Sequence, residues 1–306
     1  MTNEQRMKNL AVPTAPIDVV LDTDTYNEID DQFAIAYLLS CKEKLNTKAI
    51  YAAPFYNANS SGPADGMEKS YHEIFKVLDL MGESVAVFKG SDAFLRDEKT
   101  PILSPAALDL AERAKAYTPE NPLYVVAIGA ITNVASAILI NPDVAENTVV
   151  VWLGGHAHHY HNTREFNMMQ DVAASRVVMQ SGVPFVQLPC QGVVSGFTIS
   201  KPELLYWLKG KNALSDYLAE NTIQEADGYA LGKPWTRPIW DVTAVAWLMN
   251  DKDRFMFSRI TPLHLSNYEH QYEAAIDDHP IRYVFHIKRD ALMNDLIKRL
   301  TSDERG

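Results

Sequence analysis

Short, mostly apolar runs recur along the chain and alternate with longer amphipathic segments. The runs are rich in Val and Ile and carry few polar residues on either face, which is typical of parallel strands covered on both sides. The runs that predict strands are residues 17–21, 49–53, 85–88, 123–128, 148–153 and 185–188. The segments between them that predict helices are residues 31–39, 66–80, 105–117, 133–140 and 172–180.

This alternation of strand and helix predicts a doubly wound α/β fold with a mostly parallel central sheet and helices on both faces. Residues 201–250 are expected to be mainly helical. Residues 256–265, 272–276 and 283–287 predict further strands in a small antiparallel extension, and residues 288–300 predict a closing helix. Because no repeat or long linker divides the chain, we expect a single domain over residues 1–306.

The bulk composition excludes some classes of partner. The chain has 28 basic and 39 acidic residues and a net charge of −11, which argues against a nucleic-acid partner, since such proteins need a basic face. The N-terminal segment lacks the apolar core of a signal peptide, and no apolar run reaches the roughly 18 residues that span a membrane. Cys41 and Cys190 lack CxxC spacing, so we expect two buried thiols in a cytoplasmic protein without a membrane partner.

An acidic cluster follows the first predicted strand directly. Asp22, Asp24, Asp30 and Asp31 are four aspartates within ten positions, between an apolar strand and an apolar helix. Buried like charges repel, and their desolvation is costly unless a cation or a hydroxyl-rich substrate compensates. The other interpretation is an acidic turn with Asp30 as a helix cap, but capping explains only one or two of the four. Ligands of such sheets bind beyond the carboxyl ends of the strands, which is where this cluster falls.

Two later turns also follow buried strands. In residues 125–139, Thr132 is expected at a helix N-cap, where its hydroxyl can satisfy free amides and its carbonyl is available to a hard cation. In residues 149–171, a Gly-Gly turn leads to a histidine-rich loop and then to Glu165 and Asn167. If these two polar side chains share one face, as in a strand, they suit sugar hydroxyls; the alternative is an ordinary surface loop.

A third segment, residues 237–250, begins an amphipathic helix with Trp240 and Asp241. Taken alone, these residues fit a core side chain and a helix cap.

Together the segments DTDTYNEIDD, GAITN, GG…EFN…D and WD resemble, in the same order, the inosine–uridine-type nucleoside hydrolases. The resemblance implies an enzyme that hydrolyses the N-glycosidic bond of ribonucleosides to free base and ribose and that depends on a tightly bound Ca²⁺. It also implies a role in purine or pyrimidine salvage and a homodimer or homotetramer.

The resemblance also implies roles for individual residues. Ca²⁺ would be held by Asp24, Asp31, the main-chain oxygen of Thr132 and the carboxylate of Asp241. Asp24 would also be the general base that takes a proton from a calcium-bound water, with Asp22 supporting the cluster. The residues implied or suggested to contact substrate are Asp30, Asn57, Leu153, Glu165, Asn167, Trp240 and His156.

The chain departs from the family pattern at two informative places. Two extra residues separate Asp24 from Asp30, so the intervening loop must bulge and bring Asn27 or Glu28 into the site. Trp240 stands where the family often has a His that protonates the leaving base, and an indole can stack on a base but cannot act as that acid. Help for the leaving group would then come from His156, His158 or His159, or from stacking that raises the basicity of the ring.

Two other functions fit parts of the sequence. A haloacid-dehalogenase-like phosphatase would use Asp22 as nucleophile with Mg²⁺, but it leaves Asp30 and Asp31 unexplained and its later motif residues are not found in the chain. A non-catalytic ribose- or carbohydrate-binding protein on the hydrolase scaffold would keep the sugar site without turnover.

Overall fold

An eight-stranded sheet forms the centre of the protein in the computed structural model, which describes residues 1–302 apart from the side chain of Asp278. The order of its strands is β3-β2-β1-β4-β5-β6-β10-β9. The strands are β1 (Ile17–Thr23), β2 (Leu45–Ala52), β3 (Val87–Lys89), β4 (Leu123–Ala127), β5 (Thr148–Leu153), β6 (Phe185–Leu188), β9 (Met256–Leu263) and β10 (Ile276–Ile287). All neighbouring pairs are parallel except β9 and β10, so the predicted sheet and its antiparallel extension are confirmed.

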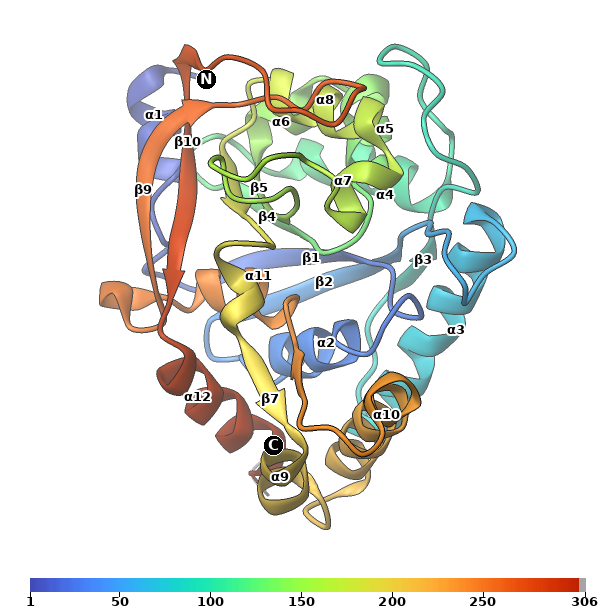
Figure 1. Ribbon diagram of the computed structural model, residues 1–306. Coiled ribbons are helices and arrows are strands. Elements are labelled where there is room, and N and C mark those ends of the chain that lie inside the picture. The colour runs from blue at the N-terminus through green and yellow to red at the C-terminus, as the bar shows by residue number, and fades with distance from the viewer. Residues whose placement is uncertain (303–306) are drawn as a thin grey trace.

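Helices cover both faces of this sheet (Figure 1). One face packs against α2 (Asp31–Leu39), α3 (Pro63–Met81), α10 (Ala213–Ala230), α11 (Val242–Leu248) and α12 (Arg289–Thr301). The other face packs against α4 (Pro105–Arg113), α5 (Thr132–Ile140), α6 (Asp143–Asn147) and α8 (Val172–Gln180). Within β1, Val19 and Leu21 enter the first core and Val20 the second, because successive side chains of a strand point to opposite faces.

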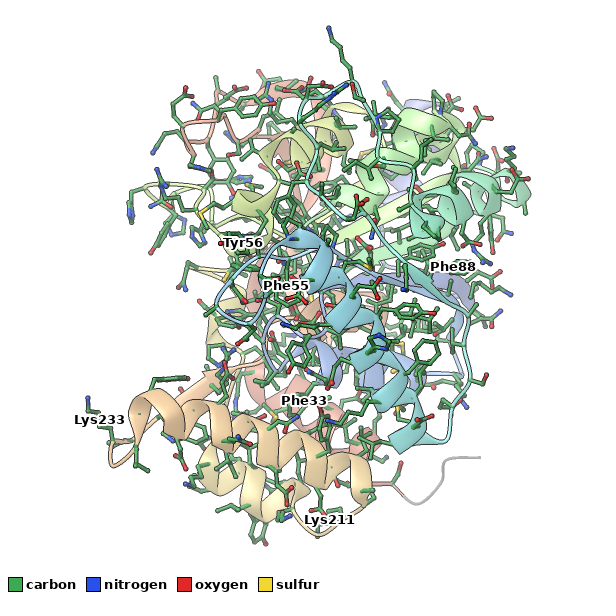
Figure 2. The ribbon with its side chains drawn as sticks, turned by 90° about the vertical axis from the view of Figure 1, so that its right-hand side faces the viewer. Phe33, Phe55, Tyr56, Phe88, Lys211 and Lys233 are labelled. Carbon is green, nitrogen blue, oxygen red and sulfur yellow. The ribbon has the colours of Figure 1, made fainter. Side chains whose placement is uncertain are left out.

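Several short elements complete the described chain. They are α1 (Asn3–Asn9), α7 (Phe166–Gln170), α9 (Lys201–Glu203), a π-helical turn (Leu204–Leu208), and the antiparallel pair β7 (Thr198–Ser200) and β8 (Thr236–Pro238). Figure 2 shows α3 facing the viewer and α10 crossing below it, with Lys211 and Lys233 near its ends. Among the described helices, none is both long and apolar enough to cross a membrane.

The C-terminal strands differ from the prediction in one respect. Residues 272–276 and 283–287 were expected as separate strands, but β10 runs continuously from Ile276 to Ile287. The pairing with β9 shifts register between Ile276 and Pro280, and a proline is tolerated at such an irregularity because it has no N–H to give to the ladder. Tyr272 lies outside the strand and forms only an isolated bridge with Ser266.

Four adjacent strands place the functional segments together. β1, β4, β5 and β6 are neighbours in the sheet and run in the same direction, so the loops that follow their carboxyl ends meet at one edge.

Cys41 and Cys190 are buried and not bonded to each other, as expected. The single domain over residues 1–306 stays a prediction.

Candidate active site

A cavity of 220 Å³ lies at this edge of the sheet. The predicted site residues that line it are Asp30, Leu153, His156, Glu165, Asn167, Trp240 and Asp241. The bulge predicted between Asp24 and Asp30 contributes Asn27 and Glu28 to the wall. The other lining residues, which the sequence analysis did not assign to the site, are Ile128, Arg164, Phe166, Cys190 and Gln191.

Three carboxylates meet at the inner end of the cavity. Asp30, Asp31 and Asp241 each offer an oxygen that lies within 4.8 Å of the other two, and all three residues are buried. Thr23 donates its hydroxyl to Asp31 Oδ1 at 2.5 Å, and the backbone N–H of Asp241 donates to Asp30 Oδ2 at 3.3 Å. Oxygen atoms grouped in this way form the kind of site that hard cations prefer.

The helix-cap interpretation of Asp30 and Asp241 is wrong. Each residue occupies the N-cap position, Asp30 of α2 and Asp241 of α11, but neither side chain accepts a capping hydrogen bond. Asp171 behaves differently, because its carboxylate caps α8 by accepting from Ala174 N–H at 2.9 Å. The Asp30 and Asp241 carboxylates therefore do not cap their helices but line the cavity, beside helix N-termini that favour negative charge.

Asp24 and Asp22 lie behind the cavity and are fully buried. Neither carboxylate oxygen of Asp24 has a hydrogen-bond partner among the described residues. Gly129 makes room for this side chain, since a Cβ at that position would come within 3.0 Å of Asp24 Cγ. Asp22 Oδ1 accepts from Asn133 Nδ2 at 2.8 Å, and Asp22, like Asp24, does not line the cavity itself.

Burial and neighbouring carboxylates raise the pKa values of the aspartates in and around this group. Burial raises the pKa of Asp22 to about 7 and that of Asp31 to about 8, where Asp30 adds to the effect. Burial also raises the pKa of Asp30 to about 6, although Arg237 opposes the shift. Asp24 and Asp241 have pKa values well above the usual range, through burial first and then through neighbouring carboxylates. The cluster therefore suits a cation that offsets its charge at neutral pH.

The EFN segment forms the start of a helix, so the prediction of a strand face is wrong. Glu165 is the N-cap of α7, and its carboxylate accepts from the backbone N–H groups of Gly155, Asn167 and Met168 at 2.9–3.0 Å. Burial raises the pKa of Glu165 to about 7, with these amides opposing the shift. Asn167 Nδ2 donates to two strand-end carbonyls, those of Ile128 and Leu153, both at 3.0 Å. Both side chains are thereby fixed against the cavity.

Two predicted positions act differently from expectation. Thr132 is the first residue of α5, and its hydroxyl donates to Asp171 Oδ2 at 2.7 Å instead of capping a helix. The role of its carbonyl as a cation ligand stays a prediction. Asn57 does not line the cavity; its Nδ2 donates to Asn27 Oδ1 at 2.6 Å and so holds the bulge that does.

A buried arginine supports the bulge, and the sequence analysis missed it. Arg237 is 4 % exposed and pairs with Glu28 at 2.5 Å and with Glu225 at 3.1 Å. Its guanidinium also lies 4.8 Å from the centre of the Trp240 ring. The sequence shows that Arg237 lies three residues before Trp240, which was the only hint that it belongs to the site. Its pairing with Glu28 joins residues 209 positions apart and therefore leaves no local pattern.

The histidines of the loop after β5 divide between the cavity and the surface. His156 lines the cavity, and its Nδ1 accepts from Gln191 N–H at 3.3 Å. His158 instead packs in a group of rings with Tyr283 and His264, and burial lowers its pKa to about 4. His159 is exposed. Only His156 is thus in position to touch a ligand in the cavity.

Comparisons with known proteins agree with this geometry. The family described as inosine-uridine preferring nucleoside hydrolase matches residues 19–279. The non-specific ribonucleoside hydrolase RihC of Salmonella paratyphi B is 28% identical over 259 residues, which cover 77% of this chain and 79% of that protein.

Solved structures share the fold at low sequence identity. The plant nucleoside hydrolase PpNRh1 superposes with a TM-score of 0.75 at 16% identity, covering 94% of this chain and 99% of that one. The purine-preferring ribonucleoside hydrolase of Gardnerella vaginalis gives a TM-score of 0.70 at 19% identity, covering 93% and 98%. The chain therefore belongs to the inosine-uridine preferring nucleoside hydrolase family and is an enzyme that hydrolyses the N-glycosidic bond of nucleosides.

Proposed function

We propose that the protein cleaves ribonucleosides to a free base and ribose with the aid of Ca²⁺. The ligands that we assign to the ion are the carboxylates of Asp24, Asp31 and Asp241 and the main-chain oxygen of Thr132. The observation that carries this proposal is the close group of buried carboxylates, together with the two Asp24 oxygens that have no partner within residues 1–302. Ca²⁺ takes six to eight oxygen ligands, so substrate hydroxyls and water have room to complete the set.

Asp30 needs a separate assignment, because its oxygen also lies within 4.8 Å of those of Asp31 and Asp241. It lines the cavity, whereas Asp31 does not, and its Oδ2 already accepts from the backbone of Asp241. We therefore assign Asp30 to the ribose hydroxyls.

The hydrolytic step follows from the positions of the protein groups. When bound, Ca²⁺ supplies positive charge that keeps the carboxylates ionised and makes a nearby water more acidic. Asp24 takes the proton of that water as it attacks the anomeric carbon, and its uncommitted oxygens suit this role. As the bond to the base lengthens, positive charge develops on the ribose, and the carboxylates of Asp30 and Glu165 stabilise it.

Glu165 and Asn167 share sugar recognition with Asp30. The carboxylate of Glu165 and Oδ1 of Asn167 offer acceptors to the ribose hydroxyls, from positions fixed by hydrogen bonds with the backbone. Leu153 gives an apolar surface beneath the sugar. Since these groups pair with hydroxyls, ribosides should be favoured over deoxyribosides.

Two further proposals rest on family membership alone: a role in purine or pyrimidine salvage, and assembly as a homodimer or homotetramer. A third proposal, a cytoplasmic location, rests on Cys41 and Cys190, whose buried free thiols suit a reducing compartment.

The proposal is tested by incubating the purified protein with inosine, adenosine, guanosine, uridine and cytidine and assaying free ribose. A chelator should abolish release, and back-titration with Ca²⁺ should restore it. Release that is unaffected by the chelator would contradict the metal assignment, and no release from any nucleoside with calcium bound would contradict the substrate class.

A further inference from the structure

One wall of the cavity offers an aromatic ring and a carboxylate but no transferable proton. Trp240 lines the cavity, and Arg237 lies behind it, 4.8 Å from the ring centre. Arg237 is itself held by Glu28 and Glu225, at 2.5 and 3.1 Å. An indole N–H does not act as an acid in water, and the Glu28 carboxylate is committed to its ion pair.

Three further groups of the cavity, His156, Glu165 and Cys190, are poor proton donors. His156 accepts the N–H of Gln191 through Nδ1, and burial lowers its pKa, which disfavours the charged imidazolium that would act as the acid. Glu165 points its two oxygens at three backbone amides. Burial raises the pKa of the Cys190 thiol, which makes it a poorer proton donor. Asp30 and Asp241 also line the cavity, but a bound cation would keep them ionised. In the described part of the chain, no lining side chain is thus placed to give an acidic proton to a departing base.

The charge of the cavity is strongly one-sided. Four carboxylates line it, those of Glu28, Asp30, Glu165 and Asp241. Against them stand the exposed guanidinium of Arg164 and the buried guanidinium of Arg237, which pairs with Glu28. Asp31 adds its carboxylate close to Asp30 and Asp241, and Asp24 adds another that has no hydrogen-bond partner among the described residues. These six carboxylates outnumber the charges of the two guanidiniums and one divalent cation, so the field favours a cationic ligand.

We propose that the preferred substrates are ribosides whose base already carries a positive charge at, or conjugated to, the glycosidic nitrogen, such as N-ribosylpyridinium and 7-alkylpurinium compounds. This inference rests on the hydrolase function proposed above and names its substrate class. The C1′–N bond breaks with its electron pair passing to the ring nitrogen, which cancels the positive charge of the base. The water oxygen forms the new C1′–O bond, and its proton passes to Asp24. The base therefore leaves neutral and needs no acid from the protein.

The test compares substrates that differ in little but charge. Nicotinamide riboside is paired with its neutral reduced form, and 7-methylguanosine with guanosine; each is incubated with the calcium-loaded full chain, and ribose is assayed. We expect kcat/KM to be at least about 100-fold higher for the cationic member of each pair, on the scale of what a missing general acid costs. Equal or faster cleavage of the neutral members would overturn this inference and leave the hydrolase function standing. Release of ribose from none of the four would overturn both.

Because cationic ribosides are inherently more reactive, a pair of variants separates the effect of the cavity from that of the substrate. Trp240→His introduces a proton donor at the aromatic wall, and Trp240→Phe keeps an aromatic ring without one. We expect Trp240→His to raise the ratio of guanosine to 7-methylguanosine turnover at least about 10-fold and Trp240→Phe not to raise it. If both variants give the wild-type ratio, the absence of an acid does not select the substrate and the inference fails.

Discussion

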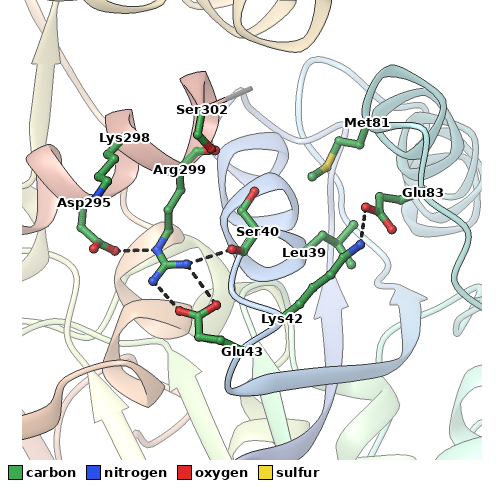
Figure 3. Close-up of a pocket in the computed structure, with 10 residues that line it drawn as sticks. All are labelled: Leu39, Ser40, Lys42, Glu43, Met81, Glu83, Asp295, Lys298, Arg299 and Ser302. Carbon is green, nitrogen blue, oxygen red and sulfur yellow. Dashed lines mark hydrogen bonds and ion pairs between the residues drawn. The ribbon is translucent and has the colours of Figure 1, made fainter. Parts of the chain in front are cut away.

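Two charged regions of the molecule differ in how their charges are arranged. The first is a groove of 350 Å³ between the C-terminal ends of α2 and α3 and the helix α12, shown in Figure 3. Lys42 pairs there with Glu83 at 2.6 Å, and Arg299 pairs with Glu43 at 2.6 Å and with Asp295 at 2.9 Å. These opposite charges satisfy one another and tie the surrounding helices together.

The second region is the smaller cavity of 220 Å³, where buried charges of one sign face one another. Asp30, Asp31 and Asp241 form a close group, and Asp24 has no hydrogen-bond partner in the part of the chain that the structure describes. Leaving such groups unpaired destabilises a fold. Unpaired buried carboxylates are therefore found where a bound ligand compensates for their charge. The comparison teaches that unpaired buried charge, and not the volume of a pocket, distinguishes the active site from a structural groove.

The most direct test of this difference is to replace Asp24, the general base that has no hydrogen-bond partner among the described residues. Asp24→Asn should lower kcat for ribose release at least about 1,000-fold, because a positioned general base contributes roughly 100- to 10,000-fold and this residue also serves the cation. Thermal stability of the calcium-free protein should not fall, since the change removes a buried like charge. Kinetics and a melting curve measure the two effects.

Asp18→Asn, in the strand β1 that leads to Asp24, is the matched control, since Asp18 is partly exposed and already pairs with Lys48 at 3.4 Å. It should retain near-wild-type turnover. Equal losses in the two variants would mean that Asp24 has no special role.

Removal of the cation should have the next largest effect. In the metal-free protein, the raised pKa values of Asp30 and Asp31, about 6 and about 8, mean that the folded state holds protons which the unfolded state has lost. The contribution of these two residues to metal-free stability should therefore be greatest below the usual carboxyl range and should be lost as pH rises through about 8. Ca²⁺ at about 100 times its Kd should restore about 2.7 kcal/mol.

Melting curves at pH 5 and pH 8.5, with and without Ca²⁺, measure this. We expect the larger Ca²⁺-dependent gain at pH 8.5. A gain that is independent of pH would indicate that the carboxylates are not neutralised by the ion.

Replacing Arg237, the buried arginine that supports the wall of the cavity, should have a smaller effect. Arg237→Met leaves Glu28 and Glu225 without their partner, and we expect a loss of about 2 kcal/mol, below the usual cost of a fully buried pair because both glutamates are about a third exposed. KM for nucleosides should rise, since the Trp240 ring loses its support. Arg96→Met is the control, since Arg96 is exposed and contacts Asp97 at 3.4 Å and Thr100 at 3.5 Å; it should change neither stability nor KM measurably.

A substitution in the groove of Figure 3, where opposite charges form ion pairs, should have the smallest effect. Glu43 is 56 % exposed, and Glu43→Gln should change the free energy of unfolding by less than about 1 kcal/mol and leave ribose release unchanged. Denaturant titration and the ribose assay measure both. A large loss of activity would show that the groove takes part in function after all.

Much of the fold and site follows from local patterns in the sequence. The parallel strands appear as continuous apolar runs because both of their faces are buried, and the loop residues that follow β1, β4 and β5 had to converge because these strands are parallel neighbours. The bulge was predictable because two extra residues must leave the path of the chain, and it does carry Asn27 and Glu28 into the cavity.

The features that could not be predicted depend on contacts between distant segments. The donation of the Thr132 hydroxyl to Asp171 and the pairing of Arg237 with Glu28 join residues 39 and 209 positions apart. Glu165 is a helix cap because amides of its own loop turn toward it, and three residues of sequence do not distinguish that from a strand. The continuity of β10 across Pro280 depends on its irregular pairing with β9.

Calorimetric titration of Ca²⁺ into the chelator-treated protein tests the central claim most directly, because it reads the cluster itself and not turnover. The account predicts one Ca²⁺ per chain, at least about 10-fold weaker binding in Asp31→Asn, where one carboxylate ligand is lost, and wild-type binding in Glu43→Gln. No binding by the wild-type chain, or equal affinity in Asp31→Asn, would contradict it.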